Sequence, residues 1–405
     1  MSQLASQPNV QNTLKTDTHI IALIGVVHGT SHFFQLALPA LFPALKADLQ
    51  LSYAELGVAM TCFYVISGIF QAVSGFVVDR IGAVRVLLLG MACLGGGALV
   101  ASFAQGLWGL YVGAALIGLG NSVFHPADFS LLNARVSSQR LGHAFSTHAL
   151  SGNLGYAAAP LTMLALEHAF GWRSALLGAV LIAALMWLLL FIQRHALDGG
   201  HHAQQKQQAN SFALRSLLAR PTFRPILCCF FFFLFAAFAT IGLQNFVPTL
   251  LQGVYPISQV VATSMLTALL LGGATGMFLG GFAASHAQHH ERIASGGMLA
   301  ATVLSLCLAT GAIPTAILLP VLFSLGLVAG ITNPSRDMLV RKAAPPGASG
   351  RVYGLVYAGL DTGAATGPAV LGWLLDLQMA RVGFVVVALA FVVNVLLAFA
   401  ARKSA

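Results

Sequence analysis

The chain has 405 residues, of which 58% are hydrophobic and only 8% are charged. Soluble domains carry roughly a quarter charged residues, so this composition excludes a water-soluble protein and indicates one embedded in a lipid bilayer. The net charge of +9 comes without a basic patch interleaved with aromatic residues, which argues against a nucleic-acid partner.

Twelve windows of the chain are apolar and long enough to cross the roughly 30 Å of hydrocarbon in a bilayer. In lipid such windows must be helices, because each backbone group has to be satisfied within its own segment. The first 18 residues lack the apolar core and cleavage site of a signal peptide, so we expect the first helix to be retained. The predicted spans are residues 19–45, 53–78, 84–104, 107–133, 141–166, 172–194, 222–251, 258–284, 292–311, 315–341, 350–375 and 381–401.

The most polar part of the chain, His195 to Arg220, divides these spans into two sets of six. A stretch of this composition cannot bury a core and is typical of a linker. We expect Ser211–Arg220 to lie on the membrane surface as an amphipathic helix. His201 and His202 fit a solvated run better than a metal site. The predicted parts are an N-terminal tail at 1–18, a six-helix bundle at 19–194, a linker at 195–221 and a second six-helix bundle at 222–405.

The two sets of spans are related by an internal repeat. Pro126 precedes Pro334 by 208 positions (334 minus 126), and Pro160 precedes Pro368 by the same distance. Two related bundles around a cavity are typical of secondary transporters. The sequence therefore predicts an all-α membrane protein with 12 transmembrane helices in two pseudo-symmetric six-helix bundles. Because proline interrupts the intrahelical ladder, we expect these four prolines to bend their spans as the bundles rock.

The placement of charge predicts the orientation in the membrane. Sixteen of the twenty Lys and Arg residues fall on the side of the amino terminus, a bias typical of cytoplasmic segments. We therefore expect a multi-pass protein of the plasma (bacterial inner) membrane with both termini in the cytoplasm. The five cysteines fall in predicted spans without a C-x-x-C pair, which indicates neither disulfides nor a zinc site.

The loop after the second span reads Gly75-Phe76-Val77-Val78-Asp79-Arg80-Ile81-Gly82. With twelve spans and a repeated half, this resembles the major facilitator superfamily, whose loop here is G-x-x-x-D-[RK]-x-G-[RK]-[RK]. Gly75, Asp79, Arg80 and Gly82 match the pattern, whereas the next two residues depart from it. We expect Gly75 to allow close helix packing and Asp79 to meet the positive amino end of a neighbouring helix during gating.

The fourth and fifth spans carry a narrower resemblance. Residues 118–126 read GLGNSVFHP and are followed by Gly152, Asn153, Gly155 and Pro160. This resembles the fosmidomycin-resistance-type branch of the superfamily, whose fourth helix carries G-x-G-x-S-x-F-H-P-E. The acid after the proline is displaced here to Asp128. The branch is associated with drug and small-anion export, so the resemblance implies efflux.

Polar side chains inside spans are the candidates for a site. A charge at mid-membrane costs about 2.5–3.5 kcal/mol, so such residues normally face protein or a watery cavity. We predict a substrate and proton pathway from His28, His32, Gln35, His125, Asp128, His148, Asn153, Gln244, Asn245, Asn333, Arg336, Asp337, Tyr357 and Asp361.

His28, His32 and Gln35 have spacings of four and three, which place them on one helical face. They fit a proton-sensitive or anion-binding stripe, or histidines that pack and bond nearby carbonyls. No carboxylate follows them closely in the sequence, so we expect no metal.

Two acids have specific predicted roles. The repeat maps Asp128 onto Arg336, which suggests a salt bridge between the bundles when the protein opens outward. The alternative is that Arg336 pairs locally with Asp337 or anchors to lipid headgroups. Asp361 is the deepest acid, and because an acid away from water holds its proton more readily, we expect it to carry the coupled proton.

These features favour a secondary active transporter that works by alternating access. We expect proton-coupled efflux of a small polar or anionic compound, such as a phosphonate-type drug or an organic acid; the alternative is proton-coupled uptake of a small organic anion. A membrane-embedded enzyme using intramembrane histidines would need a nucleophile–base motif, a C-x-x-C-H or a cofactor loop, which are missing. We expect no enzyme activity, no cofactor and a monomer whose partners are a small molecule, H⁺ and lipid.

Overall fold

The fold is described from a computed structural model, over residues 10–198, 220–343 and 349–402. Every regular element in these ranges is helical, so the predicted all-α fold is confirmed. All of the predicted amphipathic helix at Ser211–Arg220 except Arg220, and nearly all of the predicted linker, lie outside the described residues.

The first half contains seven α-helices and two short 3-10 turns. A capping box at the start of α3 joins the Ser52 hydroxyl to the backbone N–H of Glu55, and the Glu55 carboxylate to the backbone N–H of Ser52. Gly82 separates α3 from α4 with a φ of 91°, a left-handed conformation that favours glycine. The elements are α1 (Val10–Ala37), η1 (Pro39–Leu41), α2 (Phe42–Leu49), α3 (Tyr53–Ile81), α4 (Ala83–Ser102), α5 (Leu107–Asn121), α6 (Phe124–Arg135), η2 (Ser138–Arg140) and α7 (Leu141–Asp198).

The second half has six α-helices. Ser258 caps the start of α10, and its hydroxyl accepts a hydrogen bond from the backbone N–H of Val261. The elements are α9 (Arg220–Val254), α10 (Gln259–His286), α11 (His290–Thr310), η3 (Thr315–Ile317), α12 (Leu318–Ala343), α13 (Ser349–Asp376) and α14 (Ala380–Arg402).

Each predicted span coincides with helix. Ten helical segments of the described chain are long and apolar enough to cross a membrane. One of them covers 60 residues and contains two predicted spans, because α7 consists of two helices that meet at a kink at Gly171, whose φ is 82° and whose ψ is 162°. The eleventh predicted span, 350–375, is α13.

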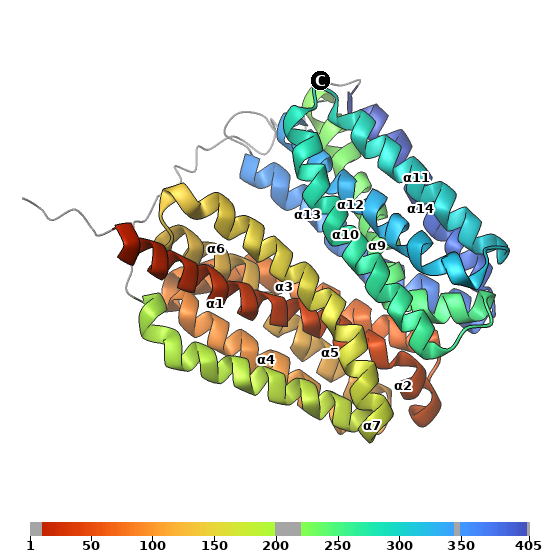
Figure 1. Cartoon of the computed structure of the whole chain (residues 1–405), viewed down its shortest axis with the longest axis horizontal. Coiled ribbons are helices and arrows are strands. Elements are labelled where there is room, and N and C mark those ends of the chain that lie inside the picture. The colour runs from red at the N-terminus through yellow and green to blue at the C-terminus, as the bar shows by residue number, and fades with distance from the viewer. Residues whose placement is uncertain (1–9, 199–219, 344–348, 403–405) are drawn as a thin grey trace, which may run out of the picture.

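The helices form two groups, α1–α7 and α9–α14, which we call the first and second bundle (Figure 1). We call the end where α1 begins, α7 ends, α9 begins and α14 ends the terminal side, and the opposite end the distal side. The ribbons of the two bundles diverge toward the terminal side (Figure 1). Toward the distal side they are joined by α3 and α13, where the Thr61 hydroxyl donates to the carbonyl of Ala365 at 2.6 Å. The exact bundle limits, 19–194 and 222–405, stay predictions.

Pro126 divides the fourth span into two helices, α5 and α6. Because proline has no backbone N–H, the carbonyl four residues earlier loses its helical partner. That carbonyl belongs to Ser122, and it accepts a hydrogen bond from the Ser74 hydroxyl of α3 at 3.2 Å. Pro160, Pro334 and Pro368 lie inside helices that continue through them, so their role as bends stays a prediction.

Helices α1 and α7 pack backbone to backbone at Gly29 and Gly155. A Cβ at Gly155 would collide with the Gly29 carbonyl oxygen. We expect Gly155→Leu to destabilise the first bundle by about 1–3 kcal/mol through overpacking, which lowers the melting temperature by several degrees. Gly142 on the same helix has no atom within 4 Å of a Cβ, so Gly142→Leu is the matched control. Equal melting temperatures for the two variants in detergent would contradict this packing.

Candidate functional site

A cavity of about 210 Å³ lies between the bundles, mostly against the second one. Its wall combines apolar side chains with a few polar ones, as is usual in small-molecule sites. The polar lining residues are Asn153 and Tyr156 of α7, Thr240 and Gln244 of α9, and Asn333 and Arg336 of α12.

Arg336 is the cationic group on this wall. Its Nε and Nη2 each donate to Asp337 Oδ1 at 3.2 Å, and its guanidinium carbon lies 4.0 Å from the centre of the Phe233 ring. The local Arg336–Asp337 pair that the sequence left open is therefore present. Only 15% of the Arg336 side chain is exposed, against 42% for Asp337, so the arginine is held in place by a carboxylate on one side and an aromatic face on another.

A chain of hydrogen bonds runs from the cavity wall into the first bundle. The Tyr156 hydroxyl donates to Gln35 Oε1 at 2.7 Å, and Gln35 Nε2 donates to Asn121 Oδ1 at 3.1 Å. Asn121 Nδ2 then donates to the Ser67 hydroxyl at 2.9 Å. Tyr156, Asn121 and Ser67 were not predicted from the sequence. The signal for Tyr156 is its position three residues after Asn153, on the same face of α7.

Four histidines and one acid gather inside the first bundle. Asp128 Oδ2 lies 3.0 Å from His28 Nδ1 and 3.1 Å from His148 Nε2. The His28 and His148 rings stack with centres 3.5 Å apart. The His125 ring centre is 5.0 Å from that of His28, and the His32 ring centre is 4.5 Å from it. We call these five side chains the histidine cluster.

The structure thus divides the predicted pathway between two places. Asn153, Gln244, Asn333 and Arg336 lie on the cavity wall, whereas none of the histidine cluster does. Gln35 is buried and reaches the wall through Tyr156. Tyr357 packs with its ring centre 5.2 Å from that of Phe233.

Asn245 and Asp361 lie where the two bundles meet. Asn245 borders a small space that also touches Pro39 and Pro160 of the first bundle. A Cβ at Gly68 of α3 would lie 3.0 Å from the Asp361 carboxyl carbon, so this acid of α13 faces the other bundle. Within the described ranges Asp361 has no hydrogen bond or ion pair.

Asp128 and Arg336 are not paired with each other in this conformation. Asp128 is fully buried against His28 and His148, and Arg336 bonds Asp337. An interbundle pair in an outward-open state stays a prediction, and it would require both sets of contacts to break.

The predicted packing of Gly75 is wrong for this conformation, because nothing lies within 4 Å of a Cβ there. Gly75 and Asp79 instead border a hollow that Pro126 and Ser130 of α6 also line. Asp79 and Arg80 are exposed. Gating by this loop stays a prediction.

Asp376, at the end of α13, holds the bundles together on the distal side. Its carboxylate accepts hydrogen bonds from the backbone N–H groups of Tyr53 (2.8 Å) and Ala54 (2.7 Å) at the start of α3. Lys46 Nζ lies 3.6 Å away. The carboxylate therefore caps the positive end of a helix that belongs to the other bundle. This contact could not be predicted from the sequence, because an acid after a span is typical of an ordinary loop.

We expect Asp376→Asn to favour separation of the bundles on the distal side, because it weakens two charge-assisted hydrogen bonds. At about 1.5–3 kcal/mol per bond to a charged group, the equilibrium should shift at least tenfold. Labelling of a cysteine at position 54 by a membrane-impermeant reagent measures this exposure. Asp48→Asn is the control, since Asp48 pairs with Arg173 within the first bundle. Unchanged labelling would contradict the role of this cap.

The model of the Major Facilitator Superfamily matches residues 21–359. The chain belongs to this superfamily.

Two relatives align with most of this chain in sequence. It is 27% identical over 381 residues to the uncharacterized MFS-type transporter YfnC of Bacillus subtilis, covering 91% of this chain and 90% of that protein. It is 22% identical over 362 residues to the fosmidomycin resistance protein of Escherichia coli, covering 89% and 87%. The predicted resemblance to the fosmidomycin-resistance-type branch is confirmed.

The fold also matches a solved structure of a transporter. A bacterial homolog of the human lysosomal transporter Spinster, solved in an inward-facing and unoccupied conformation, aligns with a TM-score of 0.75. The alignment covers 96% of this chain and 97% of that one at 15% identity. Together with the family match, this alignment confirms the predicted major facilitator fold, and the protein is a multi-pass membrane transporter by family.

Proposed function

We propose that this major facilitator protein is a proton-coupled exporter of a small polar or anionic compound, working by alternating access. The observation that carries the proposal is Arg336 on the wall of a cavity otherwise lined by amides, hydroxyls and apolar groups. Keeping a guanidinium inside a membrane protein is costly, and a ligand that pairs with it would offset the cost.

The geometry of Arg336 supports an anionic ligand. Arginine offers five N–H donors in a planar fork. Asp337 Oδ1 accepts hydrogen bonds from Nε and Nη2. The Nη1 donors have no partner within the described ranges and are open to a substrate. A carboxylate or phosphonate could accept from them, while Asn333 and Gln244 on neighbouring parts of the wall bond its other polar atoms. Gln244 Oε1 is buried without a partner among the described residues, as expected of a group that awaits one.

The position of Asp361 supports proton coupling. It lies at the contact of α3 with α13, where the bundles must shift against each other during transport. A carboxylate there has different neighbours in the two conformations, so its proton occupancy can be coupled to the conformational change. We assign the coupled proton to this residue.

The charge distribution supports the proposed orientation. With both termini cytoplasmic, the distal side faces outward and is held shut by Asp376, while the bundles diverge toward the cytoplasm. In this arrangement the substrate has access to the cavity from the cytoplasm, as the loading step of an export cycle requires. The likeness to a fosmidomycin resistance protein supports the same direction.

The test is reconstitution into liposomes with an imposed proton gradient and a pH-sensitive dye in the lumen. Small organic acids, phosphonates and common drugs are screened in both gradient directions. We expect the anion and the proton to cross the membrane in opposite directions, so that entry of the anion into the lumen raises the lumen pH. Movement of anion and proton in the same direction would indicate uptake instead. Anion flux without any pH signal would contradict coupling.

A further inference from the structure

We propose that the first bundle contains a buried transition-metal site, formed by His28, His125, His148 and Asp128, apart from the transport cavity. The four residues come from α1, α6 and α7, so a bound ion would join three helices of one bundle.

The donor atoms already converge. One ring nitrogen from each of His28, His125 and His148 lies within 4.8 Å of the other two. Asp128 Oδ2 lies 3.0 Å from His28 and 3.1 Å from His148. With metal–nitrogen bonds of about 2.0–2.1 Å, ligand atoms of a tetrahedral site are separated by roughly 3.4 Å. Side-chain rotations that move the imidazole nitrogens by about 1 Å would therefore form the site.

Three polar atoms of the cluster are buried without a hydrogen-bond partner among the described residues. Asp128 is 0% exposed, and its Oδ1 has no hydrogen-bond partner in the described part of the chain. No lysine or arginine pairs with it there; its ion-pair partners are His28 and His148. Both ring nitrogens of His32 are likewise buried without partners. Burying a carboxylate without a cation is costly, and a divalent ion would supply the missing charge.

The donor set indicates the class of metal. Imidazole ligands suit Zn²⁺, Co²⁺, Ni²⁺ and Cu²⁺, whereas Mg²⁺ and Ca²⁺ take oxygen ligands. The cluster has no thiolate, the ligand that Cu⁺ prefers. Three imidazoles with one carboxylate fit a tetrahedral Zn²⁺ or Co²⁺ site. Asp128 would either complete the coordination or hold the imidazoles through their other nitrogens, as carboxylates do around histidine-bound zinc.

The sequence predicted no metal here because no carboxylate follows His28 and His32 nearby. The fold supplies the carboxylate from α6, 100 positions after His28. Gly152 makes the assembly compact, since a Cβ there would lie 2.9 Å from the His32 ring and 3.1 Å from His28 Nε2.

Metal binding by the purified full-length protein tests the proposal. Histidines outside the site that could bind metal are removed first. The affinity tag is cleaved, and His201→Gln and His202→Gln replace the only adjacent histidine pair of the polar segment between the bundles. After chelation, Co²⁺ is titrated in detergent and followed by visible absorption, and Zn²⁺ is counted by elemental analysis after desalting. We expect one ion per chain and the intense absorption of tetrahedral Co²⁺. Absence of such binding would overturn the site.

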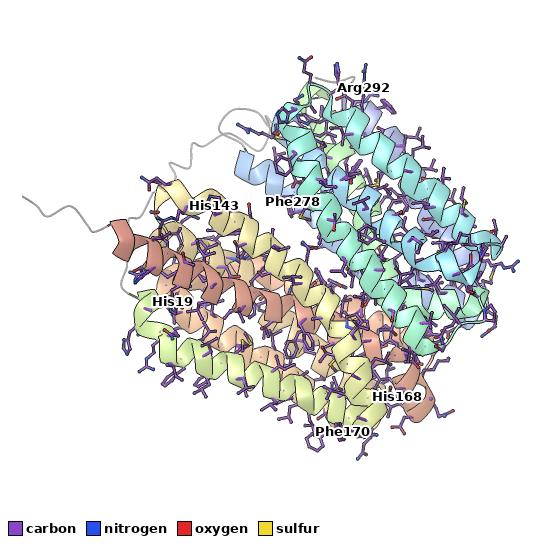
Figure 2. The ribbon with its side chains drawn as sticks, viewed as in Figure 1. His19, His143, His168, Phe170, Phe278 and Arg292 are labelled. Atoms are coloured by element: carbon purple, nitrogen blue, oxygen red, sulfur yellow. The ribbon has the colours of Figure 1, made fainter. Side chains whose placement is uncertain are left out.

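Variants locate the ion. We expect His125→Ala and His148→Ala each to weaken Co²⁺ binding at least tenfold, as ligand or orienting-group changes typically do. His143→Ala and His168→Ala are matched controls, because both histidines are exposed and lie on α7, the helix that carries His148. They lie near opposite ends of the first half of α7 (Figure 2). Unchanged binding in His125→Ala, or equal losses in the controls, would overturn the site. Helical circular dichroism and gel-filtration profiles verify folding, and His125→Gln is the second variant should His125→Ala misfold.

The outcome is independent of transport. Binding is measured in detergent without any gradient, and none of the four ligands lies on the cavity wall. Loss of metal binding with intact transport would leave the proposed function standing, and the reverse result would leave the metal site standing.

Discussion

Arg336→Gln should reduce transport of a small anion by about ten- to a hundredfold while the protein still inserts and folds. Arg336 is the cationic side chain on the cavity wall, and a hydrogen bond to a charged group is worth about 1.5–3 kcal/mol. Each 1.4 kcal/mol corresponds to a factor of ten. Radiolabelled anion flux into liposomes, at equal amounts of reconstituted protein, measures the loss.

Two further variants separate the charge of Arg336 from its geometry. Arg336→Lys keeps a positive charge but loses the planar fork, so we expect it to restore only part of the flux. Asp337→Asn keeps the arginine and weakens its local partner, so substrate binding should persist. Full anion flux in Arg336→Gln would show that the substrate is bound elsewhere and would remove the main support for an anionic substrate.

Asp361→Asn should abolish proton-driven transport and leave substrate exchange intact. The amide keeps the size of the side chain against Gly68 of α3 but cannot release a proton at any physiological pH. A carrier that cannot bind and release the proton cannot use the proton gradient to drive net transport. A carrier with bound substrate can still exchange one substrate molecule for another. Uphill flux driven by a pH gradient and counterflow of labelled substrate are the two measurements.

The pair of measurements distinguishes coupling from structure. Asp48→Asn, on the distal surface where Asp48 pairs with Arg173, should behave like the wild type in both assays. If Asp361→Asn loses exchange as well, Asp361 has a structural role at the α3–α13 contact. Normal uphill flux in this variant would assign the coupled proton to another group.

The spans and their order could be predicted from the sequence because apolar windows and helix-breaking residues act locally. The predicted separation of the fifth and sixth spans is confirmed, because the non-helical backbone of Gly171 divides α7 into two helices. The helix break before Pro126 follows from the local sequence. The hydrogen bond that the freed Ser122 carbonyl accepts from Ser74 depends on the packing of α3, 48 positions away in the chain.

The candidate site could be predicted only in part. Spacing shows which residues share a helical face, but it does not show which neighbour that face meets. His28 and Asp128 were both chosen as polar residues in spans, yet their contact depends on how α1 packs against α6. The repeat matched Asp128 with Arg336 by position, whereas the two bundles use these positions differently, one inside a bundle and one on the cavity wall.

Distances between spin labels at the two ends of the bundles test alternating access most directly. One pair is placed on the terminal side, with Ala134→Cys of α6 and Lys342→Cys of α12, and the other on the distal side, with Ala47→Cys of α2 and Leu377→Cys just after α13. The native cysteines to be replaced by serine are Cys62, Cys93, Cys228, Cys229 and Cys307.

In the conformation described, we expect a short distance for the distal pair, because Asp376 joins the bundles there. We expect a longer distance for the terminal pair, because the ribbons of the two bundles diverge toward the terminal side (Figure 1). When substrate and a proton gradient are supplied, we predict a second population in which the terminal distance shortens and the distal distance lengthens. Two distances that stay fixed, or that lengthen and shorten together, would contradict transport by alternating exposure of the cavity.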